Sequence, residues 1–156
     1  MVTYPHLYQP PYRKENRLFG RDLGFQEQRV FESIPECLLV VDRDADIVCT
    51  NAEMERLFGF QPHEVVGGPI ELLIAASQRQ AYALQLQRFL ESNSATPQCF
   101  EQRGLHKDGR DFLMEIRLGL LKKGRVVFVV NSFRDLTDRE SLDEQGPIAA
   151  LAGAGP

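Results

Sequence analysis

Three aspartates, Asp42, Asp44 and Asp46, alternate along a short polar segment, and Glu53 follows them. These residues occupy positions 1, 3, 5 and 12 of the calcium-loop pattern, in which carboxylate oxygens surround the ion. The pattern requires glycine at position 6, where the loop turns sharply, but this sequence has Ile47 there. Ile47 also begins an apolar run that is typical of a β-strand. We therefore interpret the segment as a polar hairpin turn and expect no metal site.

The sequence has three cysteines, Cys37, Cys49 and Cys99, and no Cys-x-x-Cys pair. This spacing, together with the absence of a signal-peptide pattern, favours reduced thiols in the cytoplasm. All three lie in predicted strands, where a buried thiol usually packs as a small apolar side chain. The sequence also lacks a nucleophile elbow, a phosphate-binding glycine loop and a zinc-spaced Cys/His set. We therefore expect a protein that is not an enzyme.

Composition narrows the classes of partner. The chain has 156 residues and a net charge of −4. It therefore has no excess of basic residues that would attract nucleic acid or an anionic membrane. Its uninterrupted apolar stretches, such as residues 37–41 and 126–130, are about five residues long, far shorter than the roughly 20 residues of a membrane-spanning helix. We expect a cytoplasmic protein that binds neither nucleic acid nor membrane.

The elements that must position the polar residues divide the chain into four parts. Residues 1–20 are rich in proline and have no steady period, which predicts an extended or disordered arm. Residues 21–34 carry apolar side chains at helical spacing and predict an N-terminal amphipathic helix. Residues 35–138 form one domain, and 139–156 are the start of an exit helix followed by a disordered tail.

Within the domain, apolar residues follow the two-residue spacing of strands in some segments and helical spacing in others. Strands are predicted at 37–41 and 46–50, three short helices within 52–75, one long helix at about 78–91, and strands at 98–106, 111–120 and 125–134. Asn51 is a suitable N-cap for the first of these helices. This order predicts an α+β fold, with short helices on one face of a five-stranded antiparallel sheet. Because 126–130 is apolar at every position, the other face also needs a cover, either the N-terminal helix or a second subunit of a homodimer.

Several short segments stand out in order along the chain. They are Phe31–Glu36 followed by Leu38–Asp42, Ile47–Ala52 with Leu57–Phe60, His63–Gly67, His106–Gly109 and Arg134–Glu140. In this order they resemble motifs of the PAS family of sensory domains. One departure is Ala45, where the family usually has glycine. Because alanine at positive φ has a steric cost, we expect a different turn type there.

The resemblance implies roles for two residue pairs. It implies a structural salt bridge between Glu64 and Lys107; the alternative is two solvated surface charges. It also implies that Asp135 and Thr137 form a signal-coupling hinge between the last strand and the exit helix. The alternative for Thr137 is a helix N-cap in a capping box with Glu140, and the two roles are compatible.

Some members of the family bind haem or flavin, so the resemblance leads us to consider both cofactors. In oxygen-sensing members a histidine ligates haem six residues before an arginine, and Leu86–Phe89 matches that stretch with Tyr82 at the histidine position. Tyrosinate can ligate ferric haem, but a tyrosine on an apolar helical stripe usually packs with its hydroxyl satisfied, and we expect packing. Flavin is also not expected, because residues 68–73 lack the reactive cysteine of the blue-light members. The cofactor, if any, is unknown.

The resemblance implies a signal-transduction sensor that regulates a two-component kinase, a cyclic-dinucleotide enzyme or transcription. A ligand would lie between the long helix and the inner face of the sheet; the alternatives are a closed core in a ligand-free dimerisation module, and a haem sensor. Since the sequence stops near the exit helix, we expect an effector in cis on a longer chain or in trans. The candidate lining is Tyr82, Leu86, Phe89, Phe100, Met114, Ile116 and Phe128.

Overall fold

The computed structural model describes residues 25–138. The predicted arm, 1–20, and the predicted exit helix and tail, 139–156, lie outside these residues. The first described element is helix α2, Phe25–Ser33, which falls within the predicted helix 21–34. Residues 21–24 of that prediction are also outside the described part.

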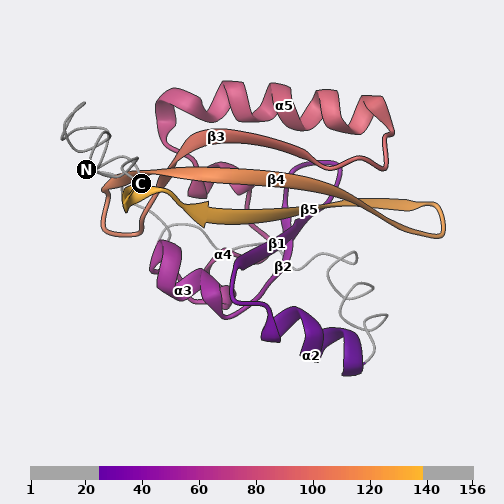
Figure 1. The fold of residues 1–156 in the computed structure, drawn as a ribbon, viewed down its shortest axis with the longest axis horizontal. Helices are drawn as coiled ribbons and strands as arrows, with labels where there is room; N and C mark the ends of the chain where they lie inside the picture. Colours follow the sequence, from indigo (N-terminus) through magenta and orange to yellow (C-terminus); the bar gives the residue numbers. More distant parts are fainter. Residues whose placement is uncertain (1–24, 139–156) are drawn as a thin grey trace, which may run out of the picture.

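A five-stranded antiparallel sheet forms the centre of the fold (Figure 1). Its strands are β1 (Cys37–Val41), β2 (Ile47–Thr50), β3 (Gln98–Leu105), β4 (Asp111–Lys123) and β5 (Val126–Asp135). They lie side by side in the order β2-β1-β5-β4-β3, and all neighbours are antiparallel. The last strand in the sequence is therefore the central strand of the sheet.

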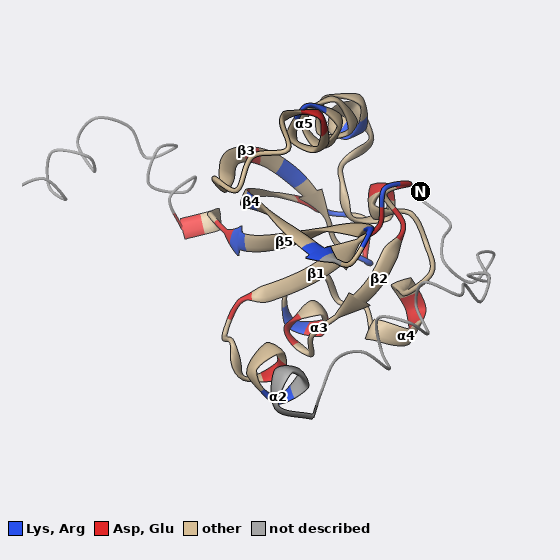
Figure 2. Ribbon diagram, turned by 90° about the vertical axis from the view of Figure 1, so that its right-hand side faces the viewer, with Lys and Arg blue, Asp and Glu red and all other residues tan. Residues whose placement is uncertain are grey.

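The helical segments lie between β2 and β3 in the sequence. They are α3 (Glu53–Phe58), α4 (Pro62–Val65), the 3₁₀ turns η1 (Ile70–Leu73) and η2 (Ala76–Gln78), and α5 (Arg79–Ser92). Figures 1 and 2 show α5 beside β3 and β4, and α3 and α4 near β1 and β2. The predicted α+β fold is confirmed.

Local residue chemistry explains where α3 and α4 end and begin. Gly59 follows α3 with φ of 80°, the left-handed conformation that glycine adopts without steric cost. Pro62 begins α4, and Gln61 and Glu64 form a capping box around its first turn. Ala45 has φ of 64°, so the expectation that alanine would change the turn type is wrong. The turn uses a left-handed residue at this position even though it is not glycine.

The prediction that Asn51 caps α3 is wrong. The residue at the N-cap is Ala52, which makes no side-chain capping bond. Asn51 is fully buried. Its Oδ1 accepts from the backbone N–H of Leu38 at 3.1 Å, and its Nδ2 donates to the carbonyls of Phe31 and Glu36 at 3.2 and 2.8 Å. The side chain therefore ties the end of α2 to the first strand.

The two faces of the sheet bury two separate apolar clusters. The inner cluster includes Leu39, Phe58, Ile116 and Phe133 and fills the space between the sheet and the helices. The outer cluster is smaller, and its buried members are Val40, Val48 and Phe128, with Phe31, Cys49, Leu121 and Val130 packed against them. Because Phe31 belongs to α2, that helix covers part of the outer face.

Candidate functional site

The predicted pocket lining lies mostly on the inner face of the sheet. On α5, Tyr82, Leu86 and Phe89 follow one another at helical spacing, so one stripe of the helix is buried. On β4, Met114 and Ile116 alternate with outward-facing residues and are both fully buried. These five side chains belong to one cluster, and Phe100 of β3 packs against it with partial exposure.

Phe128 is the exception, because it lies on the opposite face. It is 3% exposed and packs with Val40 and Val48 in the outer cluster. Since side chains alternate along a strand, the inner face of β5 carries Val129, Asn131 and Phe133 instead. Including Phe128 in the pocket lining was wrong. In a strand apolar at every position, apolarity alone does not show which residue faces which side.

A hydrogen bond between Tyr82 and Asn131 crosses the apolar core. The Tyr82 hydroxyl donates to Asn131 Oδ1 at 2.5 Å, and both side chains are buried. Burial raises the pKa of the Tyr82 hydroxyl, an effect that the bond to Asn131 partly offsets. The bond joins the long helix α5 to the central strand β5. Sequence reasoning missed Asn131, although one amide in an apolar strand is a signal of a paired polar group.

The residues around Tyr82 do not fit a haem. Its hydroxyl is engaged by Asn131, and its raised pKa disfavours the tyrosinate that would ligate iron. Helix α5 contains no histidine. His106 lies in the β3–β4 turn, where its ring packs against Gly59, and His63 is on α4. Neither histidine is buried, since His63 is exposed and His106 is partly exposed.

Glu64 and Lys107 are brought together as the resemblance implies. Lys107 Nζ donates to Glu64 Oε1 at 2.6 Å, and Lys107 also lies 5.8 Å above the Phe60 ring. The hydrogen bond from Lys107, with a backbone N–H bond from Gln61, lowers the pKa of Glu64. The backbone N–H of Lys107 donates to the carbonyl of Phe58 at 2.8 Å. Together these contacts hold the β3–β4 turn against α3 and α4.

Asp135 and Thr137 also contact each other. The Asp135 carboxylate accepts from the backbone N–H of Thr137 at 2.8 Å and from its hydroxyl. Residues 137–138 are helical, and Glu140, the predicted partner in a capping box, lies outside the described residues. The Leu136 N–H donates to the Leu113 carbonyl at 2.9 Å, which fixes the exit from β5 against β4. The carboxylate that caps this turn belongs to Asp135.

Comparison with known proteins places this arrangement in a family. The family model described as PAS fold matches residues 31–141, most of the chain. The chain belongs to the PAS fold family. The PAS domain is also similar to the sensor protein FixL of Bradyrhizobium diazoefficiens, with 24% identity over 115 residues. That alignment covers 71% of this chain and 22% of FixL, so the chain spans about a fifth of the length of this curated relative.

Solved PAS domains share the fold. One from Colwellia psychrerythraea is 23% identical with a TM-score of 0.66, and the match covers 73% of this chain and 97% of that one. Another, from a LuxR-family transcriptional regulator of Burkholderia thailandensis, was solved in complex with ethanol. It is 16% identical with a TM-score of 0.59, and the match covers 70% of this chain and 96% of that one.

The aspartates of the first hairpin form a hydrogen-bonded turn in this PAS domain. Their carboxylate oxygens lie within 4.8 Å of one another. Oδ1 of the buried Asp42 accepts from the backbone N–H groups of Asp44 and Asp46, at 2.9 and 3.1 Å. Ile47 begins β2 directly after the turn, as predicted, and Glu53 lies on α3.

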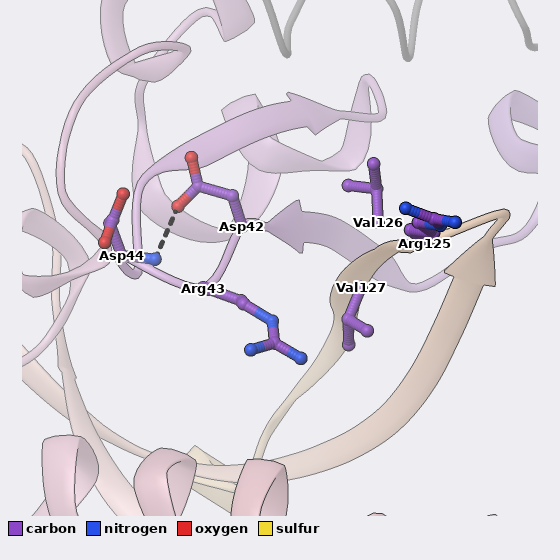
Figure 3. A pocket seen from close by; sticks show the side chains of 6 residues that line it. All are labelled: Asp42, Arg43, Asp44, Arg125, Val126 and Val127. Atoms are coloured by element: carbon purple, nitrogen blue, oxygen red, sulfur yellow. Dashed lines mark hydrogen bonds between the residues drawn. The ribbon is translucent and has the colours of Figure 1, made fainter.

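A surface pocket of about 430 Å³ lies between this turn and the start of β5 (Figure 3). Sequence analysis did not predict it, because it depends on two turns that are far apart in the chain. Its lining combines carboxylates and guanidinium groups with valines: Asp42, Arg43, Asp44, Arg125, Val126 and Val127.

The cysteines differ in environment. Cys37 is 3% exposed, and burial raises the pKa of its thiol. Burial and the nearby Glu32 raise the pKa of Cys49 to about 12. Cys37 and the partly buried Cys49 pack with apolar side chains, as predicted, whereas Cys99 is exposed on the edge strand β3. Among residues 25–138, no helix is both long and apolar enough to cross a membrane.

Proposed function

We propose that this PAS domain is a sensor that binds a small molecule at the inner face of its sheet and passes the signal to the exit helix. The observation that carries the proposal is the hydrogen bond from Tyr82 on α5 to Asn131 on β5. Four residues after Asn131, the same strand ends at Asp135, whose carboxylate holds Thr137. One strand therefore connects the candidate ligand site with the candidate hinge.

The mechanism is a shift between two populated states. A ligand that inserts between α5 and β4, or that competes for Asn131, would favour a state in which the Tyr82–Asn131 bond is altered. Because β5 lies between β1 and β4, a change in its position alters the pairing on both sides. The exit helix would then change its angle at Asp135 and Thr137. The ligand's difference in affinity for the two states limits the size of the response.

We propose no catalytic step and no haem or flavin for this domain. Burial raises the pKa of the Tyr82 hydroxyl, which disfavours its ionised form. The ethanol complex of the Burkholderia PAS domain supports a small organic ligand as one possible class. The effector would be a kinase or another output module, in cis on a longer chain or in trans.

The outer face favours a second candidate function, a ligand-free dimerisation module, and the two functions are compatible. Val126 and Phe128 alternate on the outer side of β5, and Val126 is 43% exposed. On α2, which packs there through Phe31, Val30 is 60% exposed. Exposed valines beside a buried apolar cluster suit a second copy of the same surface, and we propose a homodimer through α2 and the outer face.

Native mass spectrometry of the purified full chain tests these proposals together. A dimer that retains a small molecule, lost on denaturation, supports the sensor. A dimer without added mass, with no amide shifts in ¹⁵N-correlation spectra on titration with small alcohols and acids, favours the dimerisation module. A monomer with no retained ligand and no shifts would contradict both.

A further inference from the structure

The inner face of the sheet holds a buried acceptor that lacks a donor. Gln102 of β3 is 6% exposed, and its Oε1 has no hydrogen-bond partner. Among the described residues it is the one buried side-chain nitrogen or oxygen in this condition. An unsatisfied amide oxygen in the interior costs free energy, so a donor supplied by another molecule would bind there favourably.

Gln102 belongs to the same site as Tyr82. Along β3 it alternates with Phe100 and Gly104 on the inner face, and in the register of the sheet it lies opposite Met114 of β4. The Phe100 ring is 6.3 Å from the Tyr82 ring, and Met114 is fully buried in the inner cluster. The amide is thus a polar group at one end of the apolar site.

The outer edge of β3 beside Gln102 is covered by the segment that precedes α5. The backbone N–H of Ala75 donates to the Arg103 carbonyl at 2.9 Å, and the Arg103 N–H donates to Gln78 Oε1 at 2.5 Å. These bonds use the backbone groups of the strand next to Gln102 and leave its side chain directed to the inner face. Enclosure at the edge accounts for the burial of a glutamine on an outermost strand.

A flexible side chain lies next to this amide. A Cβ on Gly104 would lie 2.8 Å from Met114 Sδ and 2.9 Å from Phe112 Cζ, so Met114 occupies the space that the glycine leaves. Methionine has several rotatable bonds and changes rotamer at low cost. Met114 is therefore the side chain that can change rotamer to admit a ligand next to Gln102.

We propose that Gln102 is the polar contact for an uncharged ligand that presents an O–H or N–H donor on a small apolar body. This rests on the proposed sensor function and specifies its ligand class. An amide oxygen only accepts hydrogen bonds, so the ligand must donate. The buried polar or charged side chains of the described residues are Asp42, Thr50, Asn51, Gln102 and Asn131. The one charged member, Asp42, lies in the β1–β2 turn, so an ionised ligand beside Gln102 would be buried without a counter-charge.

Two isomers of equal composition test the proposal, 1-butanol with a donor and diethyl ether without one. Affinities of the full chain are measured from ¹⁵N-correlation spectra, with shifts mapped to Gln102, Met114 and Tyr82. One net hydrogen bond predicts that 1-butanol binds about 2- to 12-fold more tightly than the ether. In Gln102→Leu the two compounds bind equally, whereas Gln87→Leu, the same change on α5 at an exposed position, keeps the preference.

Each result either supports or refutes the proposed role of Gln102. If both isomers bind the wild type equally, or if Gln102→Leu keeps the preference, the role of Gln102 is refuted and the sensor function stands. If neither compound binds, this proposal is refuted and the sensor function loses support as well. Gln102→Leu replaces an unpaired amide by an apolar group, so its melting temperature should equal or exceed that of the wild type. Gln102→Met, which keeps the unbranched shape, serves as a second variant if the leucine variant does not fold.

Discussion

Replacing Tyr82 by phenylalanine removes one hydroxyl and little else. The ring keeps its place in the inner cluster, because phenylalanine has the same shape, but Asn131 Oδ1 loses the donor that lies 2.5 Å away. Since Asn131 is fully buried, water does not replace that donor without rearrangement. Tyr82→Phe therefore leaves an unsatisfied acceptor in the core.

The expected cost follows from that geometry. A buried polar group that loses its partner destabilises a protein by about 1–3 kcal/mol. For a domain of this size, 1 kcal/mol corresponds to about 4 °C, so we expect the melting temperature to fall by roughly 4–12 °C. Removing both partners, in Tyr82→Phe with Asn131→Leu, leaves no orphaned group, so the double variant should recover at least about 1 kcal/mol relative to the sum of the single changes.

Urea unfolding of the four proteins, followed by circular dichroism, measures these free energies. The dependence on urea should be the same in all four, since the surface exposed on unfolding does not change. Tyr12→Phe, the same chemical change in the predicted N-terminal arm, serves as a control and should have no effect. A loss below about 0.3 kcal/mol for Tyr82→Phe, or strict additivity in the cycle, would refute the coupling of α5 to β5 through this bond.

Three further changes have expected outcomes. Glu64→Gln should destabilise the domain at pH 7 by roughly 0.5 kcal/mol, since Lys107 loses a charged partner at a partly exposed site. Because folding lowers the pKa of Glu64 from 4.5, that stabilisation is present above about pH 4.5 and lost as the pH falls further, so urea curves of the two proteins should converge in acid. Ala45→Gly should raise the free energy of unfolding by about 0.5–1 kcal/mol. Relief of the steric cost of alanine at φ of 64°, about 1–2 kcal/mol, exceeds the extra chain entropy that glycine loses; a lower melting temperature would contradict the assigned strain. Val126→Asp, at a position 43% exposed, should dissociate the proposed dimer in light-scattering measurements without changing the circular dichroism spectrum, and an unchanged mass would locate the interface elsewhere.

Periodicity predicted the elements well, because their signals are local. The strand 37–41 and the long helix near 78–91 each carry their pattern within a few turns of chain, and β1 has the predicted bounds. The position of β5 between β1 and β4 has no such local signal, since it depends on pairing between distant segments. The family resemblance, not the periodicity, supplied the contact between Glu64 and Lys107.

The predictions that were wrong, and the buried polar residues that were not predicted, have physical causes. Phe128 lies in a strand that is apolar on both faces, where hydrophobicity does not distinguish inside from outside. Asn51 has the residue type of a cap, but three backbone groups of neighbouring segments compete for its side chain and bind it instead. Asn131 was missed although it is an amide in an otherwise apolar strand. Gln102 lies among polar residues of β3, where a glutamine is usually solvated, so only the packed structure shows that it is buried.

The central place of β5 has a consequence for synthesis on the ribosome. The β1–β2 hairpin and the β3–β4 hairpin have no shared edge until residues 126–135 emerge and insert between them. Because such non-local pairing is slow to form, both hairpins expose unpaired edges while the chain is still growing. A nascent or truncated chain that stops before Val126 should therefore be held by chaperones or aggregate. The strand that we propose to carry the signal toward an effector is also the strand that completes folding.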